Sequence, residues 1–189
     1  PYLIRNEEDL RNLALSSNES IGNKFANVYF KQTADIDLRG EQWTPICSSK
    51  SNIFAGHYDG NGFIIKNLKI DVNDDNKSMF ETSTDVTAFG LFGYIGAGET
   101  YTSSVKNVTV EVSIINNLSS HSVAGIVGCI DHTYKATNDT IPLIENCVVK
   151  GSIASRKGNA GGILGSADNS SVRTSSCTNQ IHSSLVNAR

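Results

Sequence analysis

The chain has 189 residues, of which 39% are hydrophobic and 19% charged, with a net charge of -3. This balance lacks the basic footprint of a nucleic-acid-binding protein, and no apolar run approaches the roughly 20 residues that span a bilayer. The 16 glycines, together with many Asn, Ser and Thr residues, favour turns and β-structure over helical bundles.

Residues 1–27 are predicted to form an N-terminal cap that contains one short helix. Asn6 is a favourable N-cap, and the acidic residues 7–9 suit the first helical turn. Leu10 and Leu13 then begin an apolar face at helical spacing. Such a helix would cover the open end of a stack of strands.

The next segment, 28–38, alternates as a strand does and carries two acidic residues, Asp35 and Asp37, on one face. These carboxylates could act as an acid–base pair, or they could be solvated residues that accept hydrogen bonds from backbone amides. Asp59 begins the sequence Asp-Gly-Asn-Gly, which is a strong turn signal. We expect Asp59 to shape that turn.

Two short patterns recur along the rest of the chain at intervals of about 35 to 40 residues. Strands of the form G-x-x-G begin at Gly90, Gly125 and Gly162. A second strand type bends at an Asn, which tolerates the left-handed region. The Asn residues at these bends are Asn67, Asn107 and Asn146, whose side chains are expected to stack as an amide ladder.

Repeats of this length without a helical pattern between them favour parallel strands that stack like on like. The sequence therefore predicts an all-β chain, a parallel β-helix over residues 28–189 with the short N-terminal capping helix, in one structural domain overall. No capping element ends the last repeat. Either further domains lie C-terminal to it, or another element covers that edge.

Four cysteines, Cys47, Cys129, Cys147 and Cys177, form no C-x-x-C pair, so a zinc site is not expected. We expect Cys147 and Cys177 to be small buried residues on neighbouring strands, and a disulfide between them is the alternative.

The oxygen-rich loop Asp71–Asn76 could hold calcium, but it lacks the EF-hand pattern, which favours a plain solvated loop. The four histidines show no metal-ligand spacing, and no G-x-S-x-G sequence is present. We therefore expect no catalytic residues, no metal and no cofactor.

The repeated Gly-Leu-Phe-Gly, Gly-Ile-Val-Gly and Gly-Ile-Leu-Gly sequences resemble the GLUG repeat of bacterial cell-surface and secreted proteins. The leading helix, the Ala34–Leu38 stretch, Trp43–Ile46 and Phe54–Gly62 also resemble what precedes such repeats. The resemblance implies a right-handed parallel β-helix that is exported by a bacterium. It also implies an adhesin-like role or a position beside an immunoglobulin-cleaving peptidase domain. Cys47 stands where the family usually has Gly.

Loops that follow equivalent strands should emerge on the same side of the stack. Residues 96–104 and 131–143 follow G-x-x-G strands and carry Tyr101, His132 and Tyr134, whose rings can stack on a sugar or anchor a protein contact. We predict these three residues as the ligand-binding site. Residues 73–87, 113–122 and 154–159 form a second predicted set of loops.

The predicted function is a non-enzymatic extracellular or cell-surface module for adhesion or ligand recognition. Its partner would be a host or environmental glycan or protein, with no nucleic acid. Two alternatives are a polysaccharide-degrading enzyme, since parallel β-helices host such enzymes, and a structural spacer beside a secreted peptidase domain.

Overall fold

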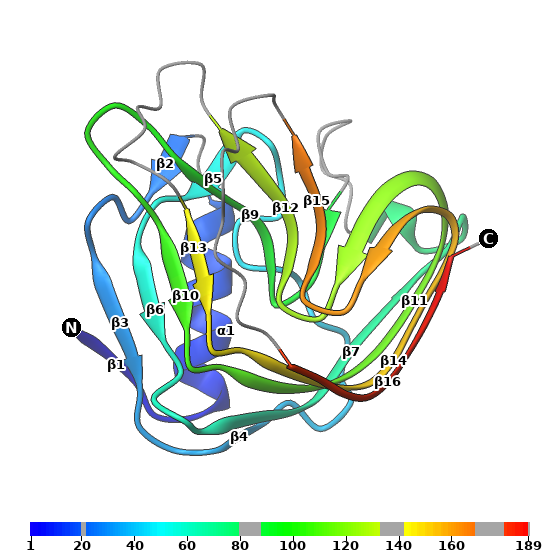
Figure 1. Ribbon diagram of the computed structural model, residues 1–189, viewed down its shortest axis with the longest axis horizontal. Helices are drawn as coiled ribbons and strands as arrows, with labels where there is room; N and C mark the ends of the chain where they lie inside the picture. The colour runs from blue at the N-terminus through cyan, green and yellow to red at the C-terminus, as the bar shows by residue number, and fades with distance from the viewer. Residues whose placement is uncertain (20–21, 80–87, 133–141, 169–179, 189) are drawn as a thin grey trace.

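The computed structural model describes residues 1–19, 22–79, 88–132, 142–168 and 180–188. The described residues are mostly strands, arranged in sheets whose neighbouring strands run parallel (Figure 1). Strands from distant parts of the sequence therefore lie side by side. The helix α1 (Glu7–Asn18) and a short 3-10 helix at Lys77–Met79 complete the described elements.

The first sheet has the order β1-β3-β6-β10-β13, with bounds Tyr2–Ile4, Tyr29–Gln32, His57–Asp59, Ser104–Lys106 and Leu143–Glu145. The second has the order β16-β14-β11-β7-β4, with bounds Gln180–Ala188, Val148–Gly161, Thr109–Ala124, Ile64–Val72 and Ile36–Asp37, and β8 (Ala88–Phe89) also pairs with β11. The third has the order β15-β12-β9-β5-β2, with bounds Leu164–Asp168, Val127–His132, Phe92–Ala97, Asn52–Phe54 and Gly22–Lys24.

These sheets do not close into a solenoid, so the prediction of a right-handed parallel β-helix is wrong. A repeat period shows that like strands stack in parallel, but it carries no information on closure. The pairing is also irregular, with register shifts between β7 and β11, within the β11–β14 pair and between β14 and β16. The short helix is present as predicted.

The G-x-x-G strands stack in register. Val127 is paired with Phe92 on one side and with Leu164 on the other, so the third position of each repeat aligns. Glycine is required in this pattern because the backbones approach closely. A Cβ on Gly128 would lie 2.6 Å from the backbone nitrogen of Phe89.

Asn107 and Asn146 form two of the predicted corners. Both adopt the left-handed region, with φ of 53° and 54°, at the bends that lead into β11 and β14. The Asn146 Nδ2 donates to Asn107 Oδ1 at 2.8 Å, which confirms the amide ladder for this pair. The Asn107 Nδ2 then donates to Asp59 Oδ1 at 2.9 Å, and not to Asn67.

The predicted equivalence of Asn67 with these corners is wrong. The register pairs Val110 with Ile65 and Val112 with Leu68, so Asn67 lies in a bulge within β7. Its φ of 57° is left-handed as well, because a bulge also needs that conformation. Asn61, with φ 54°, lies at the bend between β6 and β7 that corresponds to the later corners.

Part of the second set of predicted loops is also wrong, because two of the three segments are strands. Residues 113–122 and 154–159 lie within β11 and β14, which pair along most of their length. Their polar side chains resemble a loop in the sequence, but the strand ladder satisfies their backbone. Of the range 73–87, the residues after Met79 lie outside the described part of the chain.

Helix α1 packs against β1 and β5. The Asn6 side chain accepts a hydrogen bond from the backbone N–H of Asp9 at 2.9 Å, as an N-cap does. Leu10, Leu13 and Ala14 are buried in the main hydrophobic cluster. Within the segment predicted as a cap, β1 and β2 also pair with β3 and β5.

One hydrophobic cluster runs through most of the described molecule, from Ile4 to Ile163. Trp43 is 1% exposed within it, and its indole N–H donates to the Leu91 carbonyl at 3.2 Å. Because this core fills the inner side of the sheets, ligands can reach only their outer faces.

Candidate functional site

The outer face of the first sheet carries a groove with a volume of about 410 Å³. Its lining comes from β3, β6, β10 and β13 and from the residues just before β10. Successive strand residues point to opposite faces, so alternate residues such as His57 and Asp59 share this surface, whereas the neighbouring Phe30 and Tyr58 are buried below it. The lining residues are Tyr29, Phe30, His57, Tyr58, Asp59, Thr102, Ser103, Ser104, Lys106 and Leu143.

An aromatic pair lies at one side of this groove. The Tyr29 ring stacks on the His57 ring with centroids 4.4 Å apart and an interplanar angle of 24°. Tyr29 is 58% exposed, which is unusual for so large a ring within a sheet. The strand register places Tyr29 opposite His57 and His57 opposite Ser104, so the three side chains form one row across the strands.

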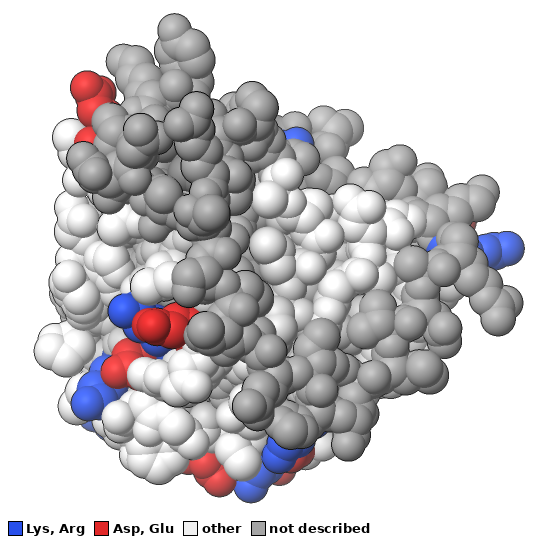
Figure 2. Space-filling view, in the orientation of Figure 1, with Lys and Arg blue, Asp and Glu red and all other residues white. Residues whose placement is uncertain are grey.

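A second row, two residues further along each strand, is charged. Lys31 is paired with Asp59, Asp59 with Lys106, and Lys106 with Glu145. The Lys106 Nζ lies 3.4 Å from Glu145 Oε2. Figure 2 shows positive and negative side chains close together at the lower left of the molecule, over the strands of this sheet.

Asp59 has a structural role within this row. Its Oδ1 accepts hydrogen bonds from the backbone N–H of Asn61 at 2.8 Å and from Asn107 Nδ2 at 2.9 Å. The prediction that Asp59 shapes its turn is therefore confirmed. The second carboxylate oxygen has no such contact among the described residues.

The pKa of His57 is lowered below its ordinary value, first by burial and then by the positive charge of Lys106. The ring is therefore neutral near neutral pH, with its Nδ1 2.9 Å from Ser104 Oγ. A neutral imidazole both donates and accepts, as a hydroxyl does. The row thus offers hydrogen-bonding groups of both kinds to a ligand.

The His57–Ser104 contact does not amount to a serine nucleophile. In such sites the base is oriented by a third group and the reaction centre faces donors for an oxyanion. Among the described residues, no carboxylate contacts His57 and Asp59 is engaged with Asn61 and Asn107.

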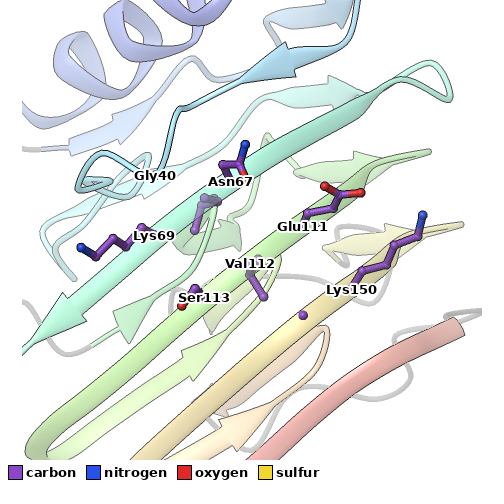
Figure 3. Close-up of a pocket in the computed structure, with 9 residues that line it drawn as sticks. Gly40, Asn67, Lys69, Glu111, Val112, Ser113 and Lys150 are labelled. Atoms are coloured by element: carbon purple, nitrogen blue, oxygen red, sulfur yellow. The ribbon is translucent and has the colours of Figure 1, made fainter.

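A second groove, of about 370 Å³, lies over the bulge on the outer face of the second sheet. Figure 3 shows Asn67 and Lys69 on β7, Glu111 on β11 and Lys150 on β14. Lys69 points away from Glu111 and Lys150, which extend toward the same side (Figure 3). Its described lining residues include no aromatic ring, so it is a weaker candidate for ligand recognition.

The structure describes only part of the predicted loop site. Tyr101 is 8% exposed, and the Cβ of an Ala at Gly98 would lie 2.3 Å from its ring, so the tyrosine packs onto the loop backbone. His132 ends β12, and Tyr134 lies outside the described residues. A ligand site at Tyr101, His132 and Tyr134 stays a prediction.

The acidic residues near β4 act as backbone ligands, as the simpler alternative predicted. Asp35 accepts from the backbone N–H of Ile64 at 3.0 Å, and this bond is the main cause of its lowered pKa. Asp37 accepts from the side-chain Nδ2 of Asn67 at 2.8 Å and from the backbone N–H of Arg39 at 2.8 Å, and these two bonds lower its pKa. Neither carboxylate is available as a poised general acid.

The Asp71–Asn76 loop is held by its own side chains. Asn73 Oδ1 accepts from the backbone N–H of Asp75 at 2.9 Å, and Asn76 Nδ2 donates to the Asp71 carbonyl at 2.8 Å. The described residues contain no group of three or more His, Cys, Asp or Glu side chains placed to hold a metal ion.

Cys47 is a buried thiol that is not reactive at neutral pH. Burial raises the pKa of Cys47 to about 12, so its thiolate does not form at neutral pH. Cys47 also adopts a φ of 54°, a conformation that Gly reaches more easily. Cys147 is 1% exposed, as predicted, whereas Cys177 lies outside the described residues.

Tyr29 and His57 are the site residues that the sequence did not reveal. Each lies in a recognisable strand, but 28 residues separate them in the chain, and only the strand register brings their rings together. A period-two pattern around His57-Tyr58-Asp59 does place His57 and Asp59 on one face. That alternation is the sequence feature from which the outward position of His57 could have been predicted.

Comparison with known proteins adds a likeness in fold. No family model matches the chain, and no curated protein matches it significantly. A crystal structure from Bacteroides ovatus, described as a "putative immunoglobulin A1 protease", resembles it with a TM-score of 0.54 and 18% sequence identity. The match covers 98% of this chain and 56% of the other, so this chain spans little more than half of that protein.

At this level of identity the similarity concerns the fold alone. The resemblance to the GLUG repeat stays a prediction. In the described part of the chain, no helix is both long and apolar enough to cross a bilayer.

Proposed function

We propose that the chain is a non-enzymatic module for adhesion or ligand recognition and that it binds through the groove on the outer face of the first sheet. The observation that carries this proposal is the exposed Tyr29 ring, stacked on His57 at the side of a groove lined with polar groups. Small-molecule and glycan sites combine an apolar surface with a few fixed polar groups. An extracellular or cell-surface location fits this role.

Replacing Tyr29 by Ala tests the site. Loss of an aromatic contact is expected to weaken binding about tenfold. The matched control is Ile115→Ala, which removes an exposed apolar side chain from the second sheet, where Ile115 is 42% exposed. Binding is measured on glycan and protein arrays, followed by titration of each hit.

An unchanged affinity in Tyr29→Ala would remove this groove as the site. Cleavage of a polymer by the wild-type chain would contradict the non-enzymatic function and favour the polysaccharide-degrading alternative.

A structural spacer beside a secreted peptidase domain is the second candidate. It is favoured by the share of the Bacteroides ovatus protein that this chain matches, 56%, because the rest of that protein lies outside the likeness. Reading the gene on both sides of this chain tests it. A neighbouring peptidase domain, together with no ligand for the groove, would support the spacer.

A further inference from the structure

Charge is balanced along the groove of the first sheet. The row of Lys31, Asp59, Lys106 and Glu145 alternates in sign from strand to strand, and its net charge is zero. The row beside it, Tyr29, His57, Ser104 and Leu143, adds no charge near neutral pH, because the pKa of His57 is lowered. The two rows together therefore carry no net charge, and the charged residues that line the groove itself, Asp59 and Lys106, are opposite in sign.

This balance discriminates between classes of ligand. An anionic polymer laid across the strands would meet the carboxylates of Asp59 and Glu145 as well as the two lysines. A cationic polymer would meet Lys31 and Lys106 in the same way. A hydroxyl group both donates and accepts hydrogen bonds, so it can pair with either sign of charge.

The groove also has the dimensions of an extended ligand. Neighbouring strands are about 4.8 Å apart, so the three steps from β3 to β13 span roughly 14 Å. Tyr29 additionally lines a second depression, of about 360 Å³, together with Pro1, Tyr2 and Val28. A polymeric ligand that lies across the sheet could therefore contact the Tyr29 ring whether it occupies the groove or the second depression.

We infer that the ligand is an uncharged saccharide chain that crosses the strands of the first sheet. One sugar ring packs its apolar face on Tyr29, and the hydroxyls of the chain pair with the alternating charged row. This inference rests on the recognition function proposed above and names its ligand class. It excludes sulfated and uronic-acid polymers as the preferred ligands.

The test compares neutral and charged polysaccharides on the intact chain. The neutral probes are laminarin, xyloglucan, galactomannan and dextran, and the anionic probes are heparin and polygalacturonate. Affinity gel electrophoresis and calorimetry are carried out at low and at high NaCl. We expect a neutral polymer to bind about tenfold more tightly than either anionic probe, with an affinity that changes less than about twofold with salt.

Two variants and one control, Ile115→Ala, test which residues cause this preference. Tyr29→Ala should weaken binding of the neutral polymer about tenfold, and Ile115→Ala should leave it unchanged. Glu145→Lys makes the face positive and should create salt-sensitive heparin binding that the wild type lacks. Circular dichroism confirms that each variant retains the fold.

The outcomes separate the inference from the proposed function. Tighter, salt-sensitive binding of an anionic polymer by the wild type overturns the uncharged ligand but keeps recognition at this face. The uncharged-saccharide inference is also overturned, and recognition kept, if the chain binds a protein whose binding is abolished by Tyr29→Ala. It is overturned in the same way if no neutral polymer binds while another ligand does. Binding that survives Tyr29→Ala removes this groove as the site, and with it the part of the proposed function on which the inference rests.

Discussion

His57 links the stability of the molecule to pH. Its pKa is lowered in the folded state by burial and by Lys106, so the unfolded chain takes up a proton more readily. The stabilisation of the folded state by neutral His57 is fully present above the pKa of the unfolded chain, near 6.5. It is lost as the pH falls through that value toward the lower pKa of the folded state.

We therefore expect the free energy of unfolding to decrease from about pH 7 to about pH 5 more steeply in the wild type than in His57→Gln. Urea unfolding at several pH values measures this. Identical slopes in the two proteins would show that His57 titrates normally in the folded chain.

Asn107 combines two separable contributions to stability. It occupies the left-handed region at φ 53°, and its amide group joins Asp59 to Asn146. Asn107→Ala loses the hydrogen bonds and also strains the backbone, whereas Asn107→Gly loses only the bonds.

The Ala variant should therefore be less stable than the Gly variant by about 1 kcal/mol. Thermal unfolding of both variants beside the wild type measures the difference. Equal stabilities would mean that the corner does not impose the left-handed conformation.

The residue types predicted the local backbone conformations well, but they did not predict which residues contact one another. Asn at the bends before β11 and β14, and Asp59 in its turn, follow from preferences that depend on the residue alone. Asn67 also has a left-handed backbone, yet its place in a bulge depends on how β7 pairs with β11. The Tyr29–His57 pair has the same origin, since register is a property of two strands and not of either sequence.

At the scale of single elements, the G-x-x-G strands depend on close backbone contact. A Cβ on Gly128 would lie 2.6 Å from the Phe89 nitrogen and 2.9 Å from the Ala88 carbonyl carbon. Backbone atoms cannot move aside as a flexible side chain does. Gly128→Ala should therefore destabilise the protein by about 1–3 kcal/mol.

Ser113→Ala, at an exposed position of β11, is the matched control and should stay close to the wild type. Chemical denaturation of both variants tests the expectation. A neutral effect of Gly128→Ala would show that β8 and β12 can separate locally without cost.

Elements were predicted from the sequence where one local pattern determined them. Helix α1 has its N-cap, acidic first turn and apolar face within a single stretch, and the structure shows each. The segments 113–122 and 154–159 were mistaken for loops because their composition is polar. Their strand conformation comes from the ladder between β11 and β14, which a local pattern does not contain.

For the whole molecule, a continuous core predicts cooperative unfolding. The main hydrophobic cluster extends from Ile4 to Ile163 and includes Trp43, the one tryptophan of the chain. Tryptophan fluorescence and far-ultraviolet circular dichroism should therefore change at the same urea concentration. Separate midpoints would show that the region around Trp43 unfolds independently of the rest.

The overall architecture was the least predictable level. The repeat period correctly indicated parallel neighbours, because like strands recur at like intervals. Closure of the sheets into a solenoid depends on bulges, bends and register shifts such as the one between Val110 and Val112. None of these has a distinct signature in the sequence.

The register of the G-x-x-G strands also bears on how such a gene can change length. Phe92, Val127 and Leu164 occupy the same place in successive repeats. Duplication or loss of one complete repeat would leave each remaining strand with a neighbour of the same kind. A shorter insertion inside a strand would turn its buried side chains to the opposite face. Unequal recombination between repeats is thus the route by which relatives of this chain could become longer or shorter while they keep their core.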